Sequence, residues 1–96
     1  MEIEQLIRIM LETIIELHLV HPYSVSILRV IELVNTWGLR IVNMATYKEK
    51  ATIGVPVQKF KKMFGENPRK KEYEVPENMK DFIQQVIVEE IVVKEK

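Results

Sequence analysis

The sequence contains no cysteine, few glycines and no long apolar run free of charged residues. Without cysteine the chain has neither disulfide bonds nor thiolate chemistry, which suits a reducing compartment. Its three glycines stand far apart, so they cannot form a glycine-rich phosphate-binding loop. The apolar N-terminal segment is interrupted by Glu2, Glu4, Arg8, Glu12 and Glu16, so it matches neither a signal peptide nor a membrane span. We therefore expect a cytoplasmic protein that does not associate with membranes.

A net charge is also lacking, because 14 lysines and arginines balance 14 aspartates and glutamates. Residues 48–71 are mainly basic, whereas residues 72–96 are mainly acidic. The basic segment indicates either a phosphate-binding patch or a solvated helix face whose charge the acidic segment offsets. The second interpretation is favoured, because no aromatic residues alternate with the lysines to stack on bases. Nucleic-acid binding is thus the alternative function, and its candidate residues are Lys59, Lys61, Lys62, Arg69, Lys70 and Lys71.

Apolar residues at steps of three and four predict an amphipathic helix from Ile3 to about Leu19. The motif His-Pro-Tyr-Ser at residues 21–24 interrupts this pattern, because proline disfavours helical angles in the residue before it. A second helix is expected to follow and to end at Trp37, with Gly38 as its stop.

A β-hairpin is predicted next, with its turn at residues 48–50 and its returning strand at residues 51–56. Within that strand Gly54 permits a bend or a close backbone approach, and Pro56 ends the strand because it has no N–H to donate. The last strand is predicted at residues 85–93.

A short amphipathic helix is predicted after Pro56, and it should end at Gly65 with a positive φ. Phe60 and Phe64 lie on the apolar side of this helix. We expect both rings to share one core with Trp37, the single tryptophan.

This order of elements predicts a single α+β domain over residues 1–96, with helices packed on one face of an antiparallel sheet. The plan is ferredoxin-like, that is, a split βαβ arrangement. Residues 1–20 would add an extra N-terminal helix to that plan.

The spacing of small and aromatic residues over residues 25–93 resembles the activation domain, or propeptide, of sedolisin-type serine-carboxyl peptidases such as kumamolisin. In that family a helix ends in a tryptophan-containing motif, a hairpin with a glycine follows, and the next helix ends in Phe-Gly. The matching residues here are Trp37, Gly38, Leu39, Gly54, Phe64, Gly65, Tyr73, Val75 and Pro76. The predicted helix at residues 1–20 departs from the family, whose domain opens with a strand. The family's catalytic serine, glutamate and aspartate belong to a peptidase domain outside this sequence, so the resemblance implies a non-catalytic domain.

The residues themselves also argue against an enzyme. His18 and His21, with Glu16 nearby, form the one arrangement that suggests a metal site or a general base. Pro22 prevents a continuous helix between them and no third ligand is evident, so two surface histidines beside a turn are the favoured interpretation. We expect no catalytic residue, no metal and no cofactor.

The favoured function is therefore a non-catalytic protein-interaction module. It would be either a freestanding inhibitor-like or chaperone-like domain or a small structural subunit of a larger assembly. A strand with two apolar faces predicts a partner-binding surface, because the helices can cover only one of them. By strict alternation that surface is Ile87, Ile91 and Val93, opposite Val86, Val88 and Val92. A homodimer is expected, formed through this strand or through the N-terminal helix.

Overall fold

The first described element of the chain is a strand, so the predicted helix is wrong over residues 11–19. The computed structural model describes residues 11–44 and 48–93, and the remainder of the predicted N-terminal helix lies outside them. Strand β1 spans Leu11–Leu19. Two local signals favour a strand: three consecutive β-branched residues from Thr13 to Ile15, and strict apolar–polar alternation from Ile15 to Leu19.

The remaining elements follow the predicted order. A two-residue strand and a single 3₁₀ turn, η1, precede the last strand. The elements after β1 are α2 (Tyr23–Trp37), β2 (Arg40–Met44), β3 (Lys50–Pro56), α3 (Val57–Phe64), β4 (Glu72–Tyr73), η1 (Glu77–Met79) and β5 (Ile83–Val93).

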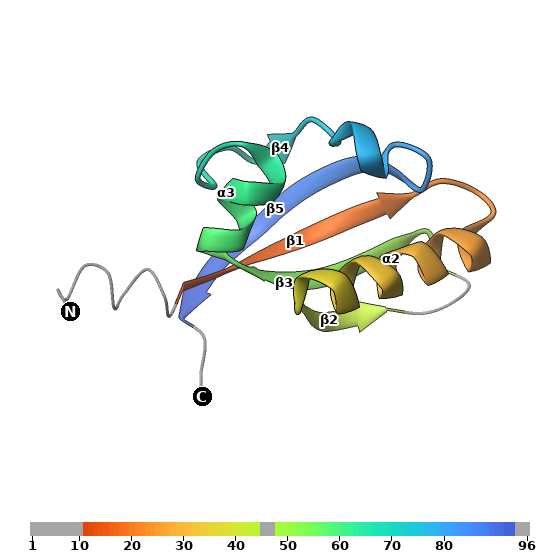
Figure 1. Ribbon diagram of the computed structural model, residues 1–96, viewed down its shortest axis with the longest axis horizontal. Helices are drawn as coiled ribbons and strands as arrows, with labels where there is room; N and C mark the ends of the chain where they lie inside the picture. The colour runs from red at the N-terminus through yellow and green to blue at the C-terminus, as the bar shows by residue number, and fades with distance from the viewer. Residues whose placement is uncertain (1–10, 45–47, 94–96) are drawn as a thin grey trace, which may run out of the picture.

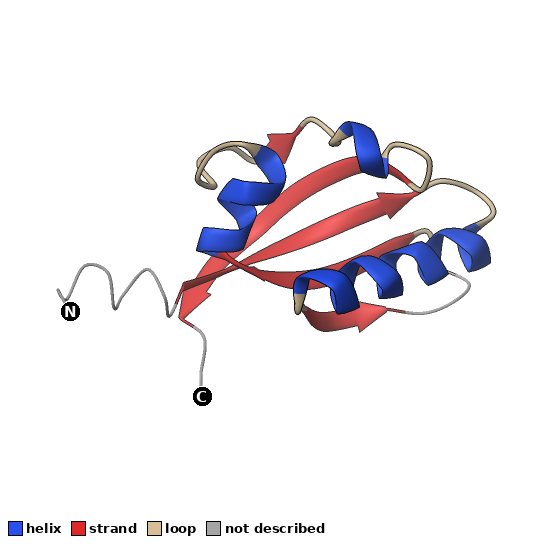
Figure 2. Ribbon diagram, in the orientation of Figure 1, coloured by secondary structure: helices blue, strands red, loops and turns tan. Residues whose placement is uncertain are grey.

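The strands form one antiparallel sheet in the order β2-β3-β1-β5-β4 (Figures 1 and 2). Strands β2 and β3 pair as predicted, from Arg40 opposite Gly54 to Met44 opposite Ala51. The α+β class and the antiparallel sheet are therefore confirmed. Strand β1 occupies the centre and pairs with β3 on one side and with β5 on the other.

Both helices cover the same face of the sheet (Figure 1). Alternate residues of β1, namely Ile15, Leu17 and Leu19, point into the core beneath them. Phe60 is fully buried in this core, whereas Trp37 and Phe64 are half-buried at its margin. The predicted aromatic cluster is thus confirmed for Phe60, and its ring centroid lies 4.5 Å from that of Phe64.

Each helix ends at a glycine, as predicted. Gly38 has φ of +66° and Gly65 has φ of +86°, in the left-handed region that favours glycine. The lysine side chain of Lys59 further satisfies the end of α2, because its Nζ donates to the carbonyls of Trp37 at 2.6 Å and Gly38 at 3.3 Å. Neither described helix is long and apolar enough to cross a membrane.

A β-bulge in β5 changes which of its residues share a face. Ile14 pairs with Glu90 and Ile15 pairs with Val88, so Glu89 is an extra residue in the ladder. One extra residue reverses the orientation of every side chain beyond it. Ile91 therefore lies on the same face as Val88, which corrects the alternation expected from the sequence.

With the bulge taken into account, β5 places different side chains on the two faces of the sheet than strict alternation predicts. Ile87 pairs with Glu16 on the outer face, which we define as the face of the sheet turned away from α2 and α3. Ile91 and Val93 pair with Thr13 and Leu11, on the face that carries the helices. The predicted grouping of Ile87 with Ile91 and Val93 on one face is therefore wrong.

Candidate partner-binding surfaces

Exposed apolar side chains gather in three places on the described parts of the chain. Contiguous exposed apolar surface marks sites of interaction more often than scattered residues do. One pair lies on α2, one on the edge strand β2 and one at the end of β5: Val25 and Leu28, Ile41 and Val42, and Ile91 and Val93.

The last five residues of β5, Glu89–Val93, pair with a described strand on one side only. We call this segment the open end of β5. On the side away from β1, strand β4 pairs only with Val86 and Ile87, and the Val88 N–H donates to the Lys71 carbonyl at 2.7 Å. No described strand pairs with that side beyond this point.

The side chains of the open end are exposed as well. Ile91 is 46% exposed and Val93 is 61% exposed, although both lie on the face that carries the helices. In Figure 1 the arrowhead of β5 (blue) lies at the tip of the sheet, beyond α3 and α2. Two of the three partner-binding residues predicted from the sequence are thus at this tip, while Ile87 is half-buried on the outer face.

Carboxylates surround the open end. Glu89 and Glu90 are both exposed. A hydrogen bond between the Glu89 and Glu16 carboxyl groups raises the pKa of Glu89 and lowers that of Glu16. His18 Nε2 lies 2.7 Å from Glu16 Oε1, and Lys50 Nζ lies 3.9 Å from the same oxygen.

A buried carboxylate lies on the outer face at the same tip, where β1 pairs with β3. Glu12 is 1% exposed, and its Oε1 accepts hydrogen bonds from Arg40 Nη2 and, at 3.0 Å, from Arg40 Nε. This contact raises the pKa of Arg40. The Glu12 side chain lies so close to Gly54 that a Cβ there would be 2.5 Å from its Cδ. Gly54 thus provides the close approach predicted for it.

The opposite edge of the sheet is better protected than the open end. Strand β2 is short, and its register with β3 shifts between Ile41 and Asn43, which leaves Val42 as a bulge. Arg40 adds a charge at its start. Short length, a bulge and charge are the usual devices that prevent an edge strand from pairing with another chain.

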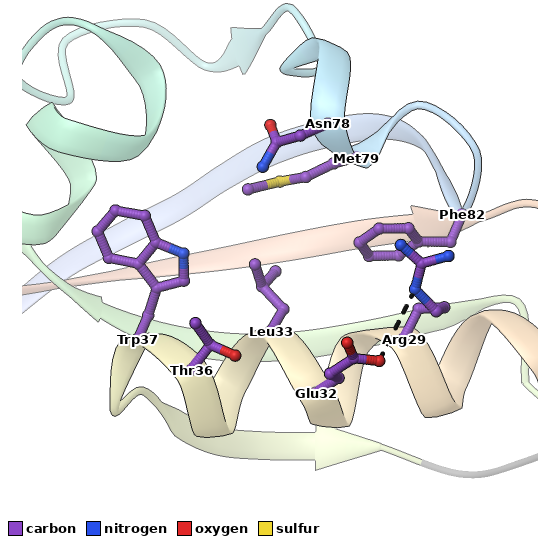
Figure 3. A pocket seen from close by; sticks show the side chains of 8 residues that line it. All are labelled: Arg29, Glu32, Leu33, Thr36, Trp37, Asn78, Met79 and Phe82. Carbon is purple, nitrogen blue, oxygen red and sulfur yellow. Dashed lines mark ion pairs between the residues drawn. The ribbon is translucent and has the colours of Figure 1, made fainter.

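A shallow groove of about 160 Å³ lies between α2 and η1 (Figure 3). The apolar residues at its floor are already buried, since Met79 is 2% exposed and Phe82 is 4% exposed. Arg29 lies across one end, 4.8 Å above the Phe82 ring, and pairs with Asp81 at 2.9 Å. The groove therefore offers little free apolar surface to a ligand.

The predicted basic patch is partly neutralised within the chain. The Lys59 Nζ already donates a hydrogen bond to the Trp37 carbonyl at the end of α2. Arg69 and Lys70 both pair with Glu66, at 3.0 and 3.1 Å, which lowers the pKa of that carboxyl. Three of the six cations proposed for phosphate binding thus already have partners in the fold.

The histidines do not form a metal site with described residues. His18 contacts Glu16 on the outer face, whereas His21 packs edge-on against the Tyr23 ring at 5.3 Å. No group of three or more metal-ligating side chains is found within residues 11–44 and 48–93.

Comparison with known proteins adds no relative. No protein-family model matches the chain, and no significant match was found among curated proteins or solved structures.

Proposed function

We propose that this chain is a non-catalytic protein-interaction module whose partner binds the open end of β5. One observation carries the proposal: β5 continues through Glu89–Val93 without a described neighbour on the side away from β1, and there it exposes Ile91 and Val93. An unpaired strand edge offers main-chain donors and acceptors to an added strand, and its apolar side chains add specificity.

The proposal includes a ferredoxin-like fold related to sedolisin-type propeptides. If the two-residue β4 is set aside, the main elements follow the order β-α-β-β-α-β, and the sheet order becomes β2-β3-β1-β5. That succession is the split βαβ plan. The presence of β1 before α2 also supports the kinship, because a strand now stands where the family's domain opens with one.

Two roles agree with such a module. It is either a freestanding inhibitor-like or chaperone-like domain or a small structural subunit of a larger assembly, and we place it in the cytoplasm. In both roles the chain contributes a surface rather than chemistry. A second copy of the chain, the homodimer expected from the sequence, is one possible occupant of that surface.

Site-specific cross-linking tests the proposal. A photo-reactive residue is introduced at Val93 and, as a matched control, at Leu28 on α2, because these side chains are 61% and 64% exposed. We expect the Val93 variant to capture a protein in cells of the source organism and the Leu28 variant to capture none. Capture only from Leu28 would place the partner on α2 and refute the assignment to β5.

Nucleic-acid binding by the basic segment is the alternative proposal. Its remaining support is Lys61, Lys62 and Lys71, which are exposed. Phosphate contacts make the logarithm of the binding constant fall steeply with the logarithm of salt concentration. A titration of single-stranded RNA at two salt concentrations, with Lys61 and Lys62 changed to glutamine, therefore separates this function from protein binding.

A further inference from the structure

We infer that the partner segment is an extended strand that places a basic residue beside Glu90 and apolar residues beside Ile91 and Val93, paired with the outer edge of the open end of β5. This inference rests on the proposed function and specifies the chemistry of its partner. It follows from the backbone, the side chains and the charge of Glu89–Val93.

The backbone of β5 extends beyond the short ladder that it forms with β4. Strand β4 supplies two paired residues, opposite Val86 and Ile87, and the Lys71 carbonyl accepts one further hydrogen bond from Val88. Every second residue of a strand turns its N–H and C=O away from a given neighbour. An added strand would therefore continue the same ladder along Glu89–Val93, past the point where β4 ends.

The two faces of the open end carry different side chains. Ile91 and Val93 lie on the face that carries the helices, whereas Glu90 and Val92, which pair with Ile14 and Glu12, lie on the outer face. Directly opposed residues of neighbouring strands share a face, and apolar pairs and opposite charges stabilise such pairs. A segment that complements this edge thus places apolar residues beside Ile91 and Val93 and a lysine or arginine beside Glu90.

The charge around the edge has the same sign as Glu90. The Glu16 carboxyl and, to a smaller extent, the Glu90 carboxylate raise the pKa of Glu89, whereas the Lys71 ammonium lowers it. Lys50 and His18 face Glu16 rather than the edge. Among the residues that the structure describes, negative charge thus exceeds positive charge beside the open end, which favours a basic partner and disfavours a second copy that would bring the same carboxylates.

Synthetic peptides test this chemistry on the full chain. The first peptide alternates lysine and valine, the second alternates glutamate and valine, and the third contains the residues of the first in two separate blocks. Binding is measured by fluorescence anisotropy, and the contact is mapped by backbone amide chemical shifts. We expect only the alternating basic peptide to shift the amides of Glu89–Val93.

A charge reversal sharpens the test. Glu90→Lys should weaken the alternating basic peptide by about fivefold to tenfold, since an attraction becomes a repulsion, and should transfer the preference to the acidic peptide. The matched control is Glu32→Lys on α2, a glutamate that is 73% exposed and distant in sequence, which should leave both affinities unchanged.

Three results would overturn the inference. Equal binding of the block peptide would show charge attraction without strand pairing. Shifts confined to other elements would show a different contact, and a dimer in sedimentation that protects Glu89–Val93 would identify a second copy as the occupant. If cross-linking at Val93 captures a protein while Glu90→Lys leaves the peptide preference unchanged, the partner chemistry is wrong but the proposed function stands.

Discussion

The first half of β5, Ile83–Val88, and its open end, Glu89–Val93, are both rich in branched apolar residues but differ in their surroundings. In the first half Ile83 is 1% exposed and Val86 is fully buried, because β1 and β4 flank the strand and the core lies above it. In the open end Ile91 is 46% exposed. Neighbouring elements, and not the composition of the strand, therefore decide which isoleucine is buried in the core and which remains exposed.

The boundary between the two halves is the bulge at Glu89. Strand β4 ends opposite Ile87, and the bulge follows two residues later. Bulges are frequent where pairing ends and where a side chain is redirected. Here the bulge turns Ile91 toward the face that carries the helices, at a position that α2 and α3 leave partly exposed.

The largest predicted effect comes from comparing the two isoleucines directly. Ile83→Ala should lower the free energy of unfolding by about 2–5 kcal/mol, because it leaves a cavity in a filled core. Ile91→Ala should cost less than about 1 kcal/mol, because much of the side chain is already in water. Urea titrations of both variants measure the difference.

One result of these titrations would contradict the contrast between the two isoleucines. A cost at Ile91 as large as that at Ile83 would mean that Ile91 is covered in the free protein, and the open end of β5 would then not be available to a partner. The same titrations performed at several protein concentrations show whether such cover comes from a second copy, because a dimer makes stability depend on concentration.

Much of the fold was predictable because its boundaries depend on single residues with strong backbone preferences. Gly38 and Gly65 end the two helices, and Pro56 ends β3. The hairpin of β2 and β3 and the close approach at Gly54 followed from the same kind of local signal.

The errors have two different physical causes. Strand β1 was misread because its apolar residues also fit helical spacing, and its central position in the sheet, between β3 and β5, is a tertiary fact. The bulge at Glu89 reverses the faces beyond it, and a bulge in a strand without glycine leaves no local sequence signal. The exposure of Ile91 depends on where β4 ends, which pattern analysis of β5 alone does not reveal.

The second prediction contrasts the open end with the closed β1–β3 side of the same tip. Arg40→Ala should lower the free energy of unfolding by about 1.5–3 kcal/mol, because the buried Glu12 carboxylate loses its charged hydrogen-bond donors. Glu90→Ala on the open side should change it by less than about 0.5 kcal/mol. Equal costs in urea titrations would contradict the contrast between the two sides.

A smaller effect is expected at Gly54. Gly54→Ala places a Cβ against the Glu12 carboxyl, and the cost should be about 1 kcal/mol, at the low end for overpacking, because only the end of a side chain must shift. With Glu12→Ala already present, the added methyl should cost almost nothing. Additive costs in this double-mutant cycle would show that the two residues do not touch in solution.

The smallest effect concerns Glu89, at the boundary between the two halves, and appears as a dependence of stability on pH. Glu16 has a pKa below the ordinary 4.5, mainly through its hydrogen bond with Glu89, so below pH 4.5 the unfolded chain binds more protons and stability rises with pH. Glu89 has a pKa above 4.5, mainly through its hydrogen bond with Glu16, so above pH 4.5 the folded chain binds more protons and stability falls as pH rises. Glu89→Gln should therefore remove the falling limb and keep the rising one, because an amide still donates to Glu16. Urea midpoints between about pH 3 and about pH 7 measure both limbs, and Glu32→Gln serves as the control. An unchanged falling limb in Glu89→Gln would show that the two carboxyl groups do not share a proton at the bulge.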